Sequence, residues 1–213
     1  MKLIMIKLDD YITTIFLDFD GVIKDSVEVK SAAFEKIFSP FGEDIARRVK
    51  EHHEVNCGIS RFIKLPIYLE WANQQGSESI IDEYAKKFSS LVVQKVIRSD
   101  WVPGILEFMN SNLHKKLFLI TATPQNEIER IVGELGIRNM FKRIIGSPAK
   151  KKDTIKKMLN QYSIDPSNAL VIGDSINDYE SALVNDVSFI LRRTYLNKEL
   201  QKELNCRMID NFL

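Results

Sequence analysis

Short apolar runs separated by longer amphipathic segments recur along most of this chain. The runs predict buried strands near residues 12–17, 117–121, 143–146, 169–173 and 187–191, with a short sixth strand near 208–210. From Val102 onward these runs alternate with helical patterns, which indicates a parallel sheet covered by helices. The pattern therefore predicts an α/β fold built on a doubly wound, Rossmann-like parallel sheet.

A long segment between the first and second predicted strands has a different pattern. Between Lys24 and about Ser99, apolar residues such as Phe34, Leu65 and Phe88 recur at helical spacing, without the alternation of a strand. This spacing predicts three to five helices. We expect a core domain of residues 1–23 and 100–213 and an inserted, all-helical cap domain of residues 24–99.

Two carboxylates lie at the end of the first predicted strand, in the sequence Asp18-Phe19-Asp20-Gly21. Residues i and i+2 of a strand point the same way, so both acids can face one ligand. Like charges this close repel each other, and a divalent cation relieves that repulsion. The alternative is a solvated turn that contains two acids.

The second strand and the fourth strand also end in polar residues. Thr121-Ala122-Thr123 offers a hydroxyl and backbone N–H groups that can bind an oxyanion. The alternative is a buried strand followed by a helix N-cap, which has the same sequence pattern. Asp174 and Asp178 lie four residues apart after Gly173. Here the alternative is a strand–turn–helix junction with a capping side chain.

Three lysines, Lys150, Lys151 and Lys152, precede a helix predicted from about Asp153 to Gln161. One of them could neutralise charge beside two carboxylates and a phosphate. We prefer Lys152, which immediately precedes the helix, and place Lys150 second. The alternative is a solvated basic run.

The order of these groups along the chain is acid pair, hydroxyl, lysine, acid pair. This order resembles that of the haloacid dehalogenase-like (HAD) superfamily, over residues 18 to about 183. The helical insertion after the first strand is similar to a type 1 cap, as in the branch of β-phosphoglucomutase and phosphoglycolate phosphatase. The resemblance implies a phosphoryl-transfer enzyme.

The resemblance also implies catalytic roles. Asp18 would be the nucleophile that takes the phosphoryl group, and Asp20 would be the general acid and then the general base. Thr121 would bind a phosphoryl oxygen and Lys152 would offset negative charge, while Gly21 and Ala122 would contact the substrate. We expect nearby negative charge to raise the pKa of Asp20 toward neutrality, as a general acid requires.

A magnesium site is implied in the same way. Asp18, Asp174 and the backbone carbonyl of Asp20 would hold Mg²⁺. Asp178 would hold metal-bound water or orient Lys152. Magnesium prefers oxygen ligands and keeps several waters, so few carboxylates suffice.

In the predicted cap, Gly58-Ile59-Ser60-Arg61 is similar to the GxSR specificity loop of β-phosphoglucomutase-like proteins. The resemblance implies that Ser60 and Arg61 contact the substrate, with the guanidinium binding an anionic group. The alternative is a helix start capped by Ser60, with Arg61 in solvent.

The mutase branch commonly has a histidine near the position of Lys30. A protonated lysine cannot gate protons at neutral pH as imidazole can, which favours hydrolysis over isomerisation. We expect a magnesium-dependent phosphatase acting on a small phosphorylated metabolite, with a sugar phosphate as the expected class. A phosphosugar mutase, a dehalogenase and a HAD-like binding protein without turnover are the alternatives.

Composition limits the partners and the compartment. A formal net charge of +1 gives no electrostatic case for nucleic acid, and no apolar run is long enough to span a membrane. The apolar start, residues 1–8, is too short and too charged for a targeting segment. Cys57 and Cys206 predict free thiols in a reducing cytoplasm. We expect a monomer, with His52 and His53 on a solvated helix face.

Overall fold

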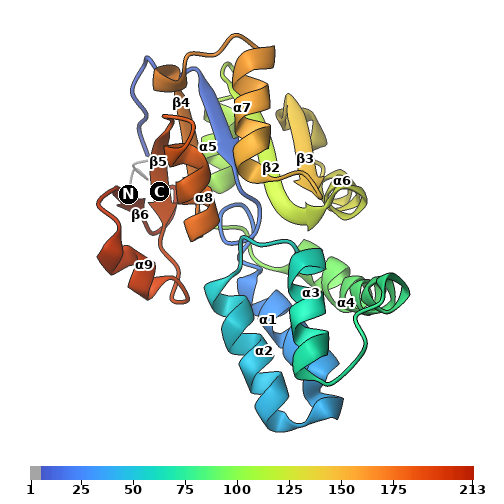
Figure 1. The fold of residues 1–213 in the computed structure, drawn as a ribbon. Helices are drawn as coiled ribbons and strands as arrows, with labels where there is room; N and C mark the ends of the chain where they lie inside the picture. The colour runs from blue at the N-terminus through green and yellow to red at the C-terminus, as the bar shows by residue number, and fades with distance from the viewer. Residues whose placement is uncertain (1–5) are drawn as a thin grey trace.

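A six-stranded parallel sheet forms the centre of the computed structural model, which describes residues 6–213 (Figure 1). Its strands are β1 (Thr14–Leu17), β2 (Lys116–Pro124), β3 (Arg143–Ser147), β4 (Ala169–Gly173), β5 (Ser188–Arg192) and β6 (Arg207–Ile209). Each expected strand is present, within a few residues of its predicted bounds. The expectation for the start of the chain falls largely on residues 1–5, outside the described residues.

The strand order is β3-β2-β1-β4-β5-β6, and all neighbours are parallel. The chain winds outward from β1 through β2 and β3, and then returns to add β4 on the other side of β1. The direction of winding thus reverses between β1 and β4. In sheets of this type, ligands bind beyond the carboxyl ends of the strands at that switch point.

Helices cover both faces of the sheet (Figure 1). Phe16 of β1 packs in one apolar cluster with residues of α7 (Lys151–Gln161) and α8 (Ile176–Leu183). Its neighbours Ile15 and Leu17 pack in the other cluster, with residues of α5 (Ile105–Ser111) and α6 (Gln125–Glu134). Successive strand residues point to opposite faces, so the two clusters form two layers of core and the doubly wound fold is confirmed.

The remaining helices of the sheet domain lie in its connections. They are α9 (Lys198–Glu203) and the 3₁₀ helices η2 (Arg138–Met140) and η3 (Pro166–Asn168). Among residues 6–213, no helix combines the length and the apolar character needed to cross a membrane. Cys57 and Cys206 are both free thiols, as expected.

Between β1 and β2 the chain forms a separate helical bundle beyond the carboxyl ends of the strands (Figure 1). It consists of α1 (Val27–Phe38), the 3₁₀ helix η1 (Ser39–Phe41), α2 (Glu43–Val55), α3 (Arg61–Trp71) and α4 (Glu78–Arg98). We call residues 27–98 the cap. Four α-helices lie within the predicted range of three to five. The domain boundaries at 23/24 and 99/100 fall in the two connections and stay a prediction.

The two histidines of α2 do not lie on a solvated face, so this expectation is wrong. His53 is 2% exposed, and His52 is half-buried with Nδ1 3.0 Å from the Tyr68 hydroxyl. Helical spacing puts His53 on the same face as Ala46 and Val49, and this face packs inside the cap. The polar residues around the histidines in sequence belong to the opposite face.

Aromatic packing holds the cap together. Phe38 is fully buried, and its ring meets Tyr68 edge-on with centroids 5.6 Å apart. We expect Phe38→Ala to lower the free energy of unfolding by about 3–5 kcal/mol, because truncation leaves a cavity in a packed core. Urea unfolding followed by circular dichroism measures this change. Phe62→Ala is the matched control: Phe62 is 41% exposed, and its loss is expected to cost about 0.5 kcal/mol or less. Equal losses of unfolding free energy in the two variants would show that packing at Phe38 does not stabilise the protein.

Candidate active site

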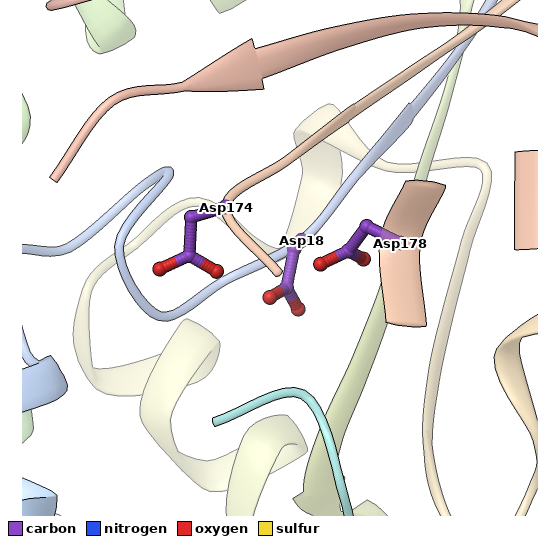
Figure 2. Close-up of side chains that lie close together, drawn as sticks. All are labelled: Asp18, Asp174 and Asp178. Carbon is purple, nitrogen blue, oxygen red and sulfur yellow. The ribbon is translucent and has the colours of Figure 1, made fainter. Parts of the chain in front are cut away.

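Three carboxylates converge at the switch point of the sheet (Figure 2). Asp18 directly follows β1, Asp174 directly follows β4, and Asp178 lies in the first turn of α8. One oxygen from each lies within 4.8 Å of the others, and all three residues are buried. The strand ends therefore bring together the acids that sequence placed far apart.

Two glycines permit this close approach. Gly21 has φ +74°, and a Cβ built there would lie 2.1 Å from Asp174 Oδ2. A Cβ on Gly173 would lie 2.2 Å from the Cβ of Asp178. Any side chain at either position would force the carboxylates apart. The Gly21 N–H donates to the Lys24 carbonyl at 2.7 Å, so its backbone forms the turn, and a substrate contact by Gly21 stays a prediction.

The lysine of this site is Lys151, which corrects the preference for Lys152 with Lys150 second. Lys151 Nζ lies 3.0 Å from Asp18 Oδ1 and 2.6 Å from Asp178 Oδ1. The helix α7 begins at Lys151, which shares its buried face with Thr154 and Ile155 at i+3 and i+4. Lys150 and Lys152 flank that face and are exposed. Helical spacing identifies Lys151 once the helix start is known, but the helix was expected to begin at Asp153, two residues too late.

Burial and mutual repulsion govern protonation in this cluster. Burial is the largest cause that raises the pKa of Asp18, to about 7, with Lys151 opposing it and Asp178 adding to it. Burial, with Asp18 next, also raises the pKa of Asp174 well above its ordinary value. Lys151 stays charged, because Asp178 and Asp18 raise its pKa more than burial lowers it. Buried oxygen donors with excess negative charge are a donor set that suits a hard divalent cation.

Asp178 is held on both sides. Its Oδ1 accepts from Lys151 Nζ at 2.6 Å, and its Oδ2 accepts from the Ser175 hydroxyl at 2.5 Å. The Ser175 side chain in turn caps α8 in a capping box with Asp178. Asp178 therefore contacts the lysine of the cluster, which is Lys151, and the two roles expected of Asp178 stay predictions.

Asp20 lies on the cap side of the cluster. Its Oδ1 accepts from the Ser26 hydroxyl at 2.6 Å, and its Oδ2 accepts from the Thr123 hydroxyl at 3.2 Å and from Lys30 Nζ. Burial would raise the pKa of Asp20, but Lys30 and these hydrogen bonds together lower it below its ordinary value. The expectation of a raised pKa is therefore wrong for this state, because the nearest charge is the cation Lys30.

Sequence reasoning paired none of these three groups with Asp20. Thr123 follows Thr121 by two residues on β2, so period-two spacing could have predicted that both hydroxyls reach one ligand. Ser26 carried no signal, because its contact depends on how the chain turns between β1 and α1.

A cavity of ≈ 310 Å³ adjoins Lys151 and Thr121. Thr121 and Ala122 line it from β2, and Ser60 lines it from the cap. The Thr121 hydroxyl accepts from the Thr123 N–H at 3.2 Å. The Ser60 and Ser147 hydroxyls are buried without a hydrogen-bond partner among the described residues. Hydroxyls of this kind can bind the oxygens of a small anion.

Arg61 is buried, 4% exposed, and does not reach solvent. Its two terminal nitrogens donate to the two carboxylate oxygens of Glu127 in α6, at 3.0 and 2.7 Å. Ser60 is the N-cap residue of α3, and its side chain makes no cap hydrogen bond. The solvated-cap alternative is thus wrong for Arg61, which is buried, while Ser60 does stand at the helix start but makes no capping bond with its side chain. A substrate contact by Arg61 stays a prediction, and in this state the residue ties the cap to the core. Nothing in the sequence pointed to Glu127.

The loop before α3 also docks on the core. The Gly58 carbonyl accepts from Asn177 Nδ2 at 2.8 Å, and a Cβ on Gly58 would lie 2.3 Å from the Ser175 hydroxyl. The cap is therefore closed over the carboxylates, with no room for a side chain at this point of contact.

Comparisons with known proteins agree with this geometry. Two curated relatives are named phosphoglycolate phosphatase. The protein from Nitrosococcus oceani is 26% identical over 79% of this chain and 78% of its own length. The protein from Pseudomonas aeruginosa is 23% identical over 79% of this chain, and the match spans 64% of that longer protein. The crystal structure of β-phosphoglucomutase from Clostridium difficile shares the fold, with a TM-score of 0.73 and 24% identity, covering 94% of this chain and 92% of that chain.

The family match extends over most of the chain. Residues 15–191 fit the haloacid dehalogenase-like hydrolase family, from the strand that leads into Asp18 to the fifth strand of the sheet. This range contains the whole carboxylate cluster, Lys151 and the cap. The chain therefore belongs to the haloacid dehalogenase-like hydrolase family.

Proposed function

We propose that this protein is a magnesium-dependent phosphatase that hydrolyses a small phosphorylated metabolite through an aspartyl-phosphate on Asp18. The observation that carries the proposal is the placement of Lys151 between Asp18 and Asp178, beside Asp174, at the switch point of the sheet. Phosphoryl transfer needs an in-line nucleophile and neutralised oxygen charge, and this arrangement offers both.

In the first step, an oxygen of Asp18 attacks phosphorus and the bond from phosphorus to the ester oxygen breaks. The leaving oxygen takes a proton from Asp20 and departs as an alcohol. Asp20 must be protonated for this step. The charge of a bound phosphate monoester opposes that of Lys30, which raises the pKa of Asp20 toward its acid role.

In the second step, Asp20 is a carboxylate and takes a proton from water. The oxygen of that water attacks phosphorus and the bond to Asp18 breaks, which releases inorganic phosphate and restores the enzyme. Thr121 and Lys151 bind phosphoryl oxygens in both steps. The closed cap excludes bulk water, and electrostatic interactions within the site are stronger as a result.

The residues that would hold Mg²⁺ are Asp18 and Asp174, with the backbone carbonyl of Asp20. When bound, the ion supplies charge neutralisation for the phosphoryl oxygens. Three carboxylates and one ammonium leave two negative charges in the cluster, and the charge of one divalent cation matches them.

A phosphosugar mutase is the second candidate, since one fold neighbour carries that name. Lys30 favours hydrolysis. Its ammonium pairs with Asp20 and donates to the Thr123 hydroxyl at 2.8 Å, at the position where mutases commonly have a histidine. A dehalogenase would not need Asp20, and a protein without turnover would not need the full set of groups. The sequence favours a sugar phosphate, whereas the curated relatives are named for phosphoglycolate.

We expect Asp18→Asn to lower kcat about a thousandfold or more, because an amide is a poor nucleophile. Release of inorganic phosphate from p-nitrophenyl phosphate measures the loss. Rapidly quenched wild-type protein should also carry one phosphoryl group on Asp18 by mass spectrometry. Asp153→Asn, at an exposed position of α7, is the control and should keep wild-type activity. Substantial turnover by Asp18→Asn would exclude the covalent route.

We expect Lys151→Ala to lower kcat by at least about a hundredfold, because it removes the only cation that contacts the nucleophile among the described residues. Its neighbour provides a matched control. Lys152→Ala removes an exposed charge and should change kcat less than about fivefold. The same phosphate-release assay compares the two variants, and the reverse order would restore the original preference for Lys152.

Magnesium should stabilise the protein as well as activate it. At about a hundredfold excess over Kd, we expect Mg²⁺ to raise Tm by about 5–10 °C in a thermal unfolding experiment, and a chelator to remove both the shift and the activity. Asp174→Asn should abolish the shift. Calcium should inhibit, because its longer bonds and extra ligands disturb in-line attack. Full activity in excess chelator would refute the metal assignment.

A further inference from the structure

A second group of basic side chains lies in the cap, and one of them, Lys30, contacts Asp20. A small cavity there is lined by Lys30, His53, Arg61 and Lys64 from the cap helices, and by Ala122 and Thr123 from β2. Among the residues that the structure describes, no acidic side chain lines it. It shares two lining residues, Ile59 and Ala122, with the cavity of ≈ 310 Å³ beside Thr121.

Charge is not balanced among these cations. Lys30 pairs with Asp20, and Arg61 pairs with Glu127. Lys64 is 2% exposed and has no ion pair with a carboxylate among residues 6–213. Its Nζ lies 2.7 Å from His53 Nδ1 and donates to the Asn56 carbonyl at 2.9 Å. A buried ammonium without a counter-ion costs several kcal/mol.

When Lys64 is charged, its contact also determines the tautomer of His53. An ammonium can only donate, so Nδ1 must accept and the ring proton lies on Nε2. His53 Nε2 is buried and has no hydrogen-bond partner among the described residues. Among residues 6–213, the charged Lys64 has two partners for its three protons and His53 Nε2 has none, so two buried donors lack an acceptor there.

We propose that Lys64 and His53 form a subsite for the carboxylate of the substrate, so that this protein prefers phosphate esters that carry a carboxylate near the phosphoryl group. The two oxygens of one carboxylate match the two donors, and its charge matches the single uncompensated cation. The inference rests on the proposed phosphatase activity and names its substrate class.

The size of the cavity favours a carboxylate over a second phosphoryl group. Its volume is ≈ 20 Å³, about the space of one water molecule. A planar carboxylate needs a smaller adjustment of the walls than a tetrahedral phosphate does. Burial also lowers the pKa of Lys64 to about 7, and a bound carboxylate would favour its charged form. Arg61, which the sequence suggested for this role, already has its counter-ion in Glu127.

The test compares acids with uncharged esters of the same length. The probes are 2-phosphoglycolate against ethyl phosphate, and 3-phosphopropionate against propyl phosphate. We expect wild-type kcat/KM to favour at least one acid over its partner by about tenfold to a hundredfold. In Lys64→Met the preference should fall to within about threefold, while kcat/KM for the alkyl phosphates stays near the wild-type value. Absence of a wild-type preference would overturn the proposal without any variant.

Lys24→Met is the matched control. Lys24 is also a 2% exposed lysine that donates to a carbonyl, that of Ile97, but it lies outside this cavity. Its loss should leave the ratio of acid to alkyl phosphate unchanged. Equal losses on acids and alkyl phosphates in Lys64→Met would show that Lys64 only supports the loop at Asn56, and would overturn the subsite.

Binding separates this inference from the proposed function. Titration calorimetry in the Asp18→Asn background should show the same preference for the acid, and Lys64→Met should remove it there too. If wild-type protein releases no phosphate from any ester with Mg²⁺, the proposed function fails, while the binding comparison still tests the subsite. Equal binding of both probes in Asp18→Asn would overturn the subsite even where hydrolysis is observed.

Discussion

The ion pairs of Lys151 are the constraint on which the rest of the site depends. One ammonium lies between Asp18 and Asp178, in a region that excludes water, and it offsets only part of the charge of three carboxylates. Burial, and after it the remaining negative charge, raise the pKa values of Asp18 and Asp174. The buried cluster therefore suits a divalent cation, whose positive charge offsets the carboxylates and also the negative charge of a phosphate.

Backbone shape makes this concentration of charge possible. Gly21 lets the turn after β1 approach Asp174, and Gly173 lets Asp178 of α8 approach the end of β4. In both places a side chain occupies the space where a Cβ would be. The cap adds a second set of charges from the opposite side, of opposite sign. Lys30 contacts Asp20, Arg61 is tied to Glu127, and Lys64 has a histidine instead of a carboxylate. The interface between cap and core is thus an acidic layer facing a basic one.

Much of the fold and part of the site could be predicted from local patterns. The six strands and the inserted helices follow from apolar periodicity, because the buried faces of strands and helices repeat at different intervals. Asp18, Thr121 and Asp174 were found because each follows an apolar run, and parallel strands end at the same edge of a sheet. Lys151 was missed by one residue, although its spacing from Thr154 and Ile155 contains the correct register.

The sequence by itself determined the strand ends, the helical insertion and the chemical types of the groups at the site, since these depend on neighbours along the chain. Only the tertiary structure decided which charges meet across the cap. The Arg61–Glu127 pair joins residues 66 positions apart. Lys64 contacts His53, which lies in a polar stretch of the sequence and gave no sign of being buried. Such pairings depend on how α2, α3 and α6 pack. Helical periodicity gives the face of each residue but not the partner that face will meet.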